Sequence, residues 1–187
     1  ASIGDVYWNH RLHNLSGDVK YFDVIERTLY NGLISGLSLD GQQFFYPNAL
    51  ESDGVYKSNR GSCTRQSWFD CSCCPTNVIR FIPSIPGLIY SKTNDEIYVN
   101  LYASNEASIA LENNNIQLIQ NTNYPWDGKV SVSVNPETES NFSIKLRVPG
   151  WARNEVLSGD LYSYLKPSTK KISLTVNGKK VAVQENE

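Results

Sequence analysis

The chain has 187 residues and a formal net charge of −2, which is enough length for one large or two small domains with a hydrophobic core. The near-neutral charge gives no electrostatic reason to expect nucleic acid or an anionic membrane as a partner. No apolar run approaches the roughly 20 residues that span a bilayer, so no membrane span is predicted.

The first part of the chain has the spacing of an amphipathic helical hairpin. A first helix is predicted by four apolar residues: Val6, Tyr7, Leu12 and Leu15. It should end at Ser16-Gly17, and Asp18 is a suitable N-cap for a second helix that continues to Leu37. Two helices joined by a glycine turn form the repeat unit of helical bundles and toroids. We therefore expect residues 1–38 to form two antiparallel helices.

From about Glu96 the pattern changes to the alternation that is typical of strands. Strands are predicted in six segments: residues 97–102, 108–111, 116–119, 130–134, 142–148 and 172–176. Asp127-Gly128 and Asn177-Gly178 are hairpin-type turns. Six short strands without an intervening helix indicate an antiparallel β-sandwich. The sequence thus predicts two regions, a helical region over residues 1–92 and a β-region over residues 93–187.

All four cysteines fall within twelve residues, at Cys63, Cys71, Cys73 and Cys74. A disulfide scaffold usually distributes its cysteines, so this clustering favours metal binding or thiol chemistry. Neighbouring thiolates suit a soft tetrahedral metal such as zinc, and a thiol at a helix N-terminus can become a nucleophile. The alternative is a single Cys63–Cys71 disulfide with Cys73 and Cys74 merely buried.

Pro75 suits the first position of a helix that follows the cysteines. The apolar face of this helix would carry Val78, Ile79, Ile82 and Ile85. Pro83 and Pro86 predict that the helix is short or kinked, because each removes a backbone donor.

Two other polar features are interpreted as structural. His10 and His13 lie three residues apart on the first predicted helix, and a shared metal is one use of such spacing. We expect ordinary polar helix residues there instead. Glu26 with Arg27 is expected to make a helix-surface or interhelix contact and not to act as a catalytic acid.

Several segments occur in an ordered series along the chain. They are residues 26–32, 38–48, 71–77 with Arg80, 123–128 and 146–152. On these segments the chain resembles the bacterial DUF1680 group of glycoside hydrolases. That group contains the zinc-dependent β-L-arabinofuranosidases of family GH127, with GH146 close by. The resemblance extends over essentially the whole chain.

The resemblance implies an α+β multidomain fold, with the terminal helices of an (α/α)₆ barrel followed by an antiparallel β-sandwich. It implies that Cys73 is the nucleophile and a zinc ligand, that Cys74 is a second zinc ligand, and that Tyr46 lies near the sugar. The expected activity is retaining hydrolysis of β-L-arabinofuranosides through the zinc-bound cysteine, with an L-arabinofuranose-containing glycan as the substrate.

The chain also departs from its relatives at the start. In the family, a Glu-x-Cys segment immediately before the stretch corresponding to Ala1 supplies two further zinc ligands, and the general-acid glutamate lies further upstream. The chain contains no Met at all. We therefore interpret it as a fragment that is catalytically incomplete by itself. Zinc can be absent from such a fragment. The thiols favour reducing conditions, in a bacterial cytoplasm or periplasm.

A second hypothesis from a different class remains open. The chain could instead be a non-catalytic carbohydrate-binding or structural β-sandwich module, in which the cysteines hold a structural zinc.

Overall fold

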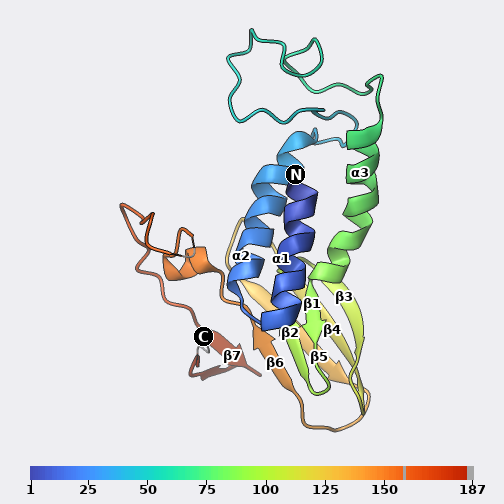
Figure 1. Ribbon diagram of the computed structural model, residues 1–187. Coiled ribbons are helices and arrows are strands. Elements are labelled where there is room, and N and C mark those ends of the chain that lie inside the picture. Colours follow the sequence, from blue (N-terminus) through green and yellow to red (C-terminus); the bar gives the residue numbers. More distant parts are fainter. Residues whose placement is uncertain (158, 185–187) are drawn as a thin grey trace.

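The computed structural model describes residues 1–157 and 159–184. Within these residues the helices stand side by side, with the sheets at one end and a long loop at the other (Figure 1). Helix α1 (Ser2–Ser16) is followed by Gly17, whose φ of 73° is the left-handed conformation that glycine adopts at a helix end. Helix α2 (Lys20–Arg27) then runs back along α1, so the predicted helical hairpin is confirmed. No helix among the described residues is both long and apolar enough to cross a membrane.

The second helix extends nearly as far as predicted, but its winding changes twice. After α2 it continues as a π-helix, η1 (Thr28–Leu33), and then as a 3₁₀ turn, η2 (Ile34–Gly36). The N-cap is Val19 and not Asp18, as the sequence had indicated. Asp18 still satisfies one free donor at this end, because its Oδ1 accepts the backbone N–H of Lys20 at 2.9 Å.

The helix after the cysteines is short, as the prolines predicted. Helix α3 (Cys73–Phe81) is followed by a 3₁₀ segment, η3 (Ile82–Leu88). Pro75 occupies the third position of α3 and not the first, because the helix already begins at Cys73. The predicted apolar face is only partly used: the side chains of Ile79 and Ile82 are 66% and 43% exposed, whereas Phe81 is buried.

A single apolar cluster holds the helices together and reaches the first strands. Its buried members are Val6, Phe22, Ile25, Leu29, Leu33, Phe81, Leu88, Ile89 and Leu101. Burial of this cluster fixes α3 beside α1 and α2. The end of α3 that carries the cysteines therefore has a fixed place relative to the hairpin.

The β-region contains two three-stranded sheets and one hairpin. The first sheet has the order β1 (Tyr90–Lys92), β2 (Glu96–Val99), β6 (Ser143–Leu146). The second has the order β3 (Asn105–Ala110), β4 (Asn115–Thr122), β5 (Val130–Pro136). Ile97 from the first sheet packs with Ile116 and Leu118 from the second in a separate buried cluster. The described chain is thus a mixed α+β structure with few helices.

Two features of the sheets differ from the expectation. Strands β2 and β6 pair in parallel, with Ile97 opposite Ile144, whereas every other strand pair in the described residues is antiparallel. A parallel pair needs a long connection, and residues 100–142 provide it by forming the whole second sheet in between. Strand β1 was not predicted, because its three residues are too few to show an alternating pattern.

One predicted hairpin turn is confirmed, and the other lies in the expected connection, where the hydrogen-bonded turn begins earlier, at Asn123. The segment Asp127-Gly128 falls in the connection between β4 and β5. Asn177-Gly178 joins β7 (Leu174–Val176) to β8 (Lys179–Val181), and both turn residues have positive φ, 51° and 77°. This is the geometry of a two-residue type I′ hairpin.

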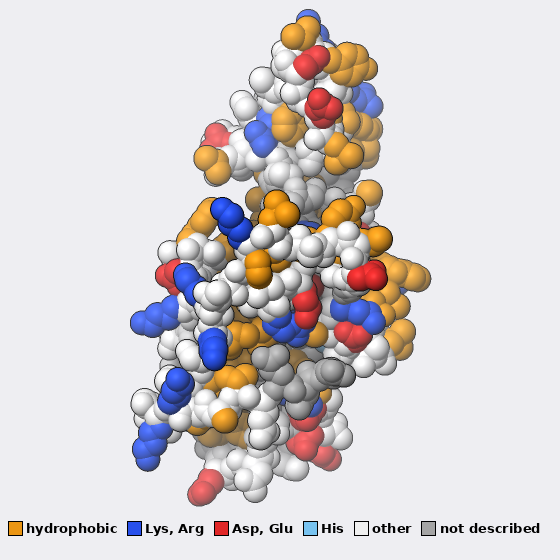
Figure 2. All heavy atoms as spheres, turned by 90° about the vertical axis from the view of Figure 1, so that its left-hand side faces the viewer, with side chains coloured by type: hydrophobic (Ala, Val, Ile, Leu, Met, Phe, Trp, Pro, Cys, Tyr) orange, Lys and Arg blue, Asp and Glu red, His pale blue; other side chains and the backbone are white. Residues whose placement is uncertain are grey.

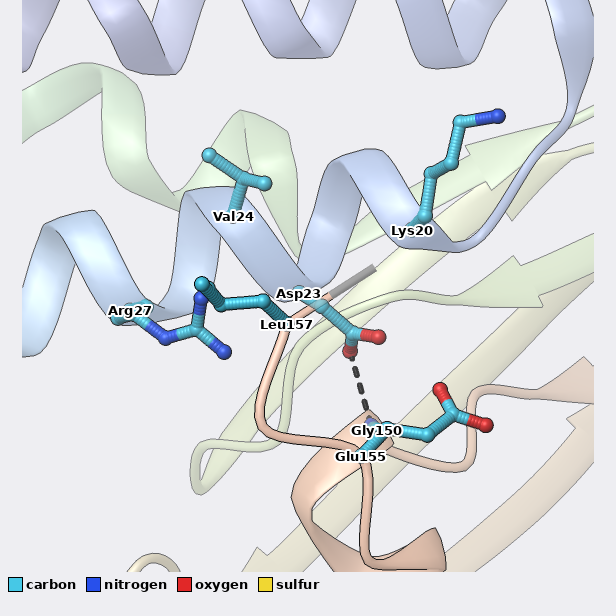
Figure 3. Close-up of a pocket in the computed structure, with 7 residues that line it drawn as sticks. All are labelled: Lys20, Asp23, Val24, Arg27, Gly150, Glu155 and Leu157. Carbon is cyan, nitrogen blue, oxygen red and sulfur yellow. Dashed lines mark hydrogen bonds between the residues drawn. The ribbon is translucent and has the colours of Figure 1, made fainter. Parts of the chain in front are cut away.

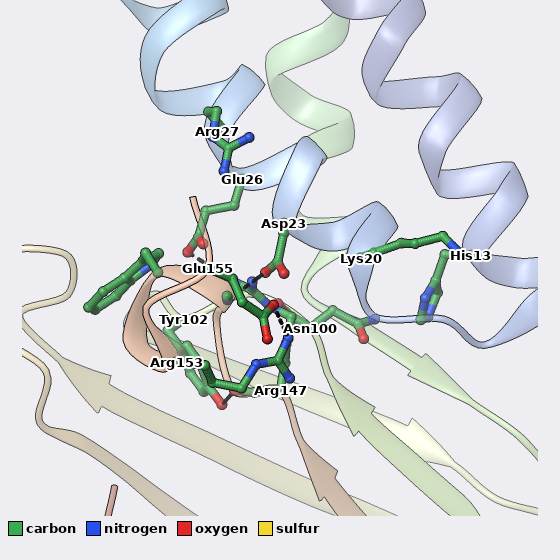
Figure 4. Close-up of polar contacts among 12 residues, drawn as sticks. His13, Lys20, Asp23, Glu26, Arg27, Asn100, Tyr102, Arg147, Arg153 and Glu155 are labelled. Carbon is green, nitrogen blue, oxygen red and sulfur yellow. Dashed lines mark hydrogen bonds and ion pairs between the residues drawn. The ribbon is translucent and has the colours of Figure 1, made fainter. Parts of the chain in front are cut away.

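A buried arginine joins the helices to the β-region (Figure 4). The side chain of Arg147, directly after β6, is only 2% exposed. Its Nη1 lies 2.6 Å from Oδ1 of Asp23, and its Nη2 lies 2.9 Å from Oε1 of Glu26. Its Nε donates to the carbonyl of Asn100 at 2.5 Å. Burial lowers the pKa of Arg147, but the neighbouring carboxylates outweigh that effect and raise it.

Glu26 is therefore not a helix-surface residue, because it is buried against Arg147. Aromatic hydroxyls complete this junction. The Tyr124 hydroxyl donates to Glu26, and the Trp151 indole donates to the Tyr124 oxygen at 3.2 Å. The Tyr102 hydroxyl donates to the Arg147 carbonyl at 2.5 Å. Three sequence segments that looked independent, residues 26–32, 123–128 and 146–152, thus meet at one place.

Gly150 is required at the edge of this junction. Its backbone N–H donates to Oδ1 of Asp23 at 3.1 Å. A Cβ added at this position would lie 2.8 Å from Oδ2 of the same carboxylate, which Arg147 already holds in place. The segment can therefore approach α2 only without a side chain here.

We expect Gly150→Ala to lower the free energy of unfolding by about 1–3 kcal/mol, because the added methyl must push Asp23 away from Arg147. Urea unfolding of the purified protein measures this change. Gly128→Ala is the matched control, since a Cβ there meets nothing within 4 Å. Equal effects of the two substitutions would contradict the proposed crowding.

A second prediction concerns alkaline pH. Burial raises the pKa of Tyr102 to about 12, with the charge of Arg147 opposing this rise and that of Glu26 adding to it. The folded pKa lies above the ordinary value of about 10, so the neutral phenol contributes stability that is complete below pH ~10 and is lost as the pH rises toward ~12.

Tyr102→Phe removes this titration. Between pH 9 and pH 11.5, the free energy of unfolding should fall by about 2 kcal/mol less in Tyr102→Phe than in the unsubstituted chain. Denaturant titrations at the two pH values test this, with Tyr56→Phe, whose side chain is 76% exposed, as the control. An identical loss of stability in Tyr102→Phe and the unsubstituted chain would count against it.

Candidate active site

The cysteines lie at the end of the helices farthest from the sheets (Figure 1). Cys73 and Cys74 are the first two residues of α3, where free backbone N–H groups and the helix dipole favour negative charge. All four cysteines are free thiols. The alternative of a Cys63–Cys71 disulfide with a buried Cys73 is therefore wrong, and Cys73 is in fact exposed.

Cys73 has two close polar neighbours. Its Sγ lies 2.8 Å from Oη of Tyr46 and 3.7 Å from Sγ of Cys74. The structure thus brings together the three residues that the resemblance singled out. The sulfur separation is far too long for a disulfide. It matches the separation of about 3.8 Å between two sulfur ligands that each lie ~2.3 Å from a tetrahedral zinc ion.

The thiol environment also includes Cys71, from the predicted cysteine cluster, and Arg60, which the sequence did not indicate. Hydrogen bonds from Tyr46 and then from the backbone and side chain of Cys73 lower the pKa of Cys71 to about 7, and the charge of Arg60 adds to this effect. Burial and then the hydrogen bond with Cys73 raise the pKa of Cys74. The hydrogen bonds to Cys73 and Cys71 raise the pKa of the Tyr46 phenol.

A long loop between η2 and α3 carries Tyr46 to the cysteines. It forms no helix or strand, and its ends are held by the isolated bridges Leu37–Phe44 and Phe44–Gln66 and by a few further backbone hydrogen bonds, such as that from Phe45 to the carbonyl of Gly36. The loop forms a lobe that protrudes beyond the helices, with several apolar side chains on its surface (Figure 2). Its most exposed large apolar residues are Leu39, Leu50, Val55, Tyr56 and Trp68.

The donor set for a metal is partial in this chain. Within residues 1–157 and 159–184, no group of three or more His, Cys, Asp or Glu side chains is arranged to hold a metal ion. The Cys73–Cys74 pair fits two corners of a tetrahedron, as its sulfur separation shows. His13 uses its Nδ1 on the carbonyl of Asp18 at 3.1 Å and packs its ring against Phe22. His10 packs against the same Phe22 ring.

A cavity of about 210 Å³ lies between α2 and the segment that follows β6 (Figure 3). Its lining consists of Lys20, Asp23, Val24, Arg27, Gly150, Glu155 and Leu157. The polar groups are already engaged: Asp23 binds Arg147, Arg27 donates to the carbonyl of Val156, and Glu155 pairs with Arg153. The cavity is therefore part of the junction between α2 and the β-region. The thiol cluster remains the better candidate for the active site.

Family models match both parts of the chain. Residues 1–87 match the model of the beta-L-arabinofuranosidase GH127 catalytic domain, and residues 96–187 match that of the GH127 middle domain. A relative named non-reducing end beta-L-arabinofuranosidase, from Bifidobacterium longum subsp. longum, is 35% identical over 188 residues. The match covers 96% of this chain and 26% of the relative, so the chain spans about a quarter of that protein's length.

Solved structures agree with these matches. A GH127 beta-arabinofuranosidase is 51% identical with a TM-score of 0.89, over 99% of this chain and 28% of its own. A GH127 beta-L-arabinofuranosidase from Geobacillus stearothermophilus T6 is 39% identical with a TM-score of 0.78, over 96% of this chain and 26% of its own. Helices, sheets and motifs are thus those of one group of glycoside hydrolases. The chain belongs to family GH127.

Proposed function

We propose that the protein is a retaining glycoside hydrolase that acts on β-L-arabinofuranosides, with Cys73 as its nucleophile. The observation that carries this proposal is the Tyr46 hydroxyl, 2.8 Å from an exposed Cys73 thiol at the first position of a helix. Membership of GH127 and the printed names of the relatives support the substrate class. In the same proposal, α1, α2 and α3 are terminal helices of an (α/α)₆ barrel, and the β-region is a sandwich.

Zinc fits this site through its two adjacent thiols. When bound, zinc would keep coordinated sulfur deprotonated at neutral pH. Cys73 and Cys74 would hold it, in keeping with their 3.7 Å sulfur separation. We propose that a Glu-x-Cys segment ahead of the position of Ala1 supplies the other two ligands. The first turn of α1 supports this, because it lies at the same end of the helices as the cysteines (Figure 1).

The reaction then needs one covalent step by this chain's own residue. The Cys73 thiolate forms a carbon–sulfur bond to the anomeric carbon, the bond from that carbon to the leaving oxygen breaks, and a general acid outside this chain gives the oxygen a proton. The same group, now a base, takes a proton from water, whose oxygen displaces the sulfur as a thiolate from the same carbon, and the released sugar keeps its configuration. Tyr46 orients the thiolate and donates to it or to a sugar hydroxyl.

The second hypothesis, a structural zinc in a non-catalytic carbohydrate-binding module, accounts less well for Cys73. Structural zinc sites are closed by four protein ligands. Here Cys73 is exposed and hydrogen-bonded to a tyrosine, which is the setting of a thiol that meets a substrate.

Replacing the cysteines one at a time in the whole protein should separate their roles. We expect Cys73→Ser to lower kcat for an aryl β-L-arabinofuranoside by at least about 10³-fold, because a serine hydroxyl is not ionised near neutral pH. Cys74→Ser should act through lost metal and regain part of its activity with added zinc. Cys63→Ser is the control, since Cys63 contacts only the carbonyl of Tyr56.

Mass spectrometry of the protein trapped with a slow arabinofuranoside identifies the nucleophile directly. A sugar adduct on Cys73 is the expected result. An adduct on a carboxylate, or inversion at the anomeric carbon, would overturn the proposal.

Metal content provides a separate prediction. The whole protein should contain about one zinc per chain, and a chelator should abolish activity that added zinc restores. Elemental analysis should find the zinc retained in Cys63→Ser and reduced in Cys74→Ser. Absence of zinc together with chelator-resistant activity would refute the metal assignment.

A further inference from the structure

Tyr46 lies on a loop in which almost no side chain is buried. Between Ile34 and Ser72, all of which the structure describes, only Asn59 and Phe69 are buried. Loops without strands or helices have few interactions that fix a side chain. The two buried residues are therefore the natural place to look for what holds the tyrosine.

Asn59 holds the backbone of Tyr46. The Asn59 side chain is completely buried, and its Oδ1 accepts the backbone N–H of Tyr46 at 2.8 Å. Its Nδ2 donates to the carbonyl of Thr64, also at 2.8 Å. The Asn59 backbone pairs with that of Ser62 through both its N–H and its carbonyl. One amide thus ties together loop segments that are thirteen and five residues away from it.

Neighbouring groups hold the ring of the same tyrosine. The Phe69 ring lies with its centroid 5.5 Å from that of Tyr46 in an edge-on arrangement. The guanidinium carbon of Arg60 lies 4.1 Å from the centre of the Tyr46 ring. Arg60 has a φ of 47°, a conformation that non-glycine residues adopt rarely and that the buried Asn59 next to it helps to hold.

We propose that Asn59 is a positioning residue that acts on catalysis only through Tyr46, by fixing the Tyr46 hydroxyl against the Cys73 sulfur. This rests on the proposed function, in which Cys73 is the nucleophile. The side-chain hydrogen bonds of Asn59 go to the backbone of the loop and not to Cys73.

An amide is well matched to this task because it offers an acceptor and donors on one short side chain. In Asn59→Ala, the N–H of Tyr46 and the carbonyl of Thr64 lose their buried partners. Backbone hydrogen bonds hold the preceding residues, Phe44 to Gln66 and Phe45 to Gly36, but the backbone N–H of Tyr46 itself is held by Asn59. Without Asn59, the Tyr46 hydroxyl is therefore expected to move away from Cys73. Small displacements of this kind are enough to lower the rate of a chemical step strongly.

A double-mutant cycle in the whole protein tests the route through Tyr46. Asn59→Ala should lower kcat for an aryl β-L-arabinofuranoside by about 10- to 100-fold. In a Tyr46→Phe background, Asn59→Ala should change kcat by less than about twofold, because the hydroxyl that it positions is already absent. Asn48→Ala is the matched control, since Asn48 is an exposed asparagine of the same loop that bonds only to Ser35. A full loss of kcat from Asn59→Ala in the Tyr46→Phe background would overturn the proposal.

A second readout does not need glycosidase activity. The rate at which iodoacetamide alkylates Cys73 in the metal-free protein, followed by peptide mass spectrometry, reports the Tyr46 contact directly. Asn59→Ala should change this rate in the same direction as Tyr46→Phe and by a similar factor, at least about threefold, whereas Asn48→Ala should leave it unchanged. A Cys73 rate in Asn59→Ala equal to that of the unsubstituted protein would overturn the proposal even if the protein proved inactive on arabinofuranosides.

Asn59→Asp guards against a folding defect. This variant keeps the acceptor for the Tyr46 N–H, and burial of the site favours the protonated carboxyl, whose O–H can donate to the Thr64 carbonyl. It should therefore keep the Cys73 alkylation rate closer to that of the unsubstituted protein than Asn59→Ala does. The same large change in both variants would show that the loop as a whole, and not the bond to Tyr46, sets the rate, and would contradict the proposal.

Discussion

The ion pairs between Arg147 and the two carboxylates of α2 are the constraint on which the rest of the structure depends. A guanidinium that is 2% exposed is stable only if opposite charges and carbonyl acceptors surround it. Loss of Asp23 or Glu26 alone would leave a buried charge without its partner, which typically costs about 3–5 kcal/mol. The helices and the β-region therefore form one unit through a polar junction, in addition to the apolar cluster that reaches Leu101. Gly150 makes the close approach possible, the Tyr124 hydroxyl donates to Glu26, and the Tyr102 hydroxyl donates to the backbone carbonyl of Arg147.

The polar junction at Arg147 and the thiol cluster are far apart along the helices. The junction lies at Asp23 and Glu26 of α2, next to the β-region, and the thiols lie where α3 begins, beside the end of η2 (Figure 1). The helices and strands around the junction are regular elements, and their packing gives α3 a fixed direction. The site itself combines one rigid part, Cys73 and Cys74 on a helix, with one part carried by a loop, Tyr46. A loop that positions a hydroxyl accurately needs contacts within the loop. Asn59 provides a hydrogen bond to the Tyr46 backbone, and Phe69 packs against the Tyr46 ring.

Local patterns accounted for much of the fold. The helical hairpin, the short helix after the cysteines and the strand alternation each follow from residues that are close in sequence. Pairings between distant segments were not accessible in this way. The bond between Arg147 and Asp23 joins positions 124 apart, and nothing in either segment alone identifies its partner. The contact of Tyr46 with Cys73 was available only from the family resemblance, and Asn59 had no signal, because a single asparagine in a polar loop looks like any turn residue.

The parallel pairing of β2 with β6 also bears on the order in which the chain can fold. Strands β2 and β6 are separated by residues 100–142, which form an antiparallel meander whose strands pair with their neighbours in sequence. Local pairings close small loops and form quickly, whereas distant ones must first overcome a larger loss of chain entropy. Arg147 follows β6 directly. The guanidinium that pairs with α2 is therefore positioned when the last strand of this sheet pairs. We therefore expect the junction to close after the second sheet has formed.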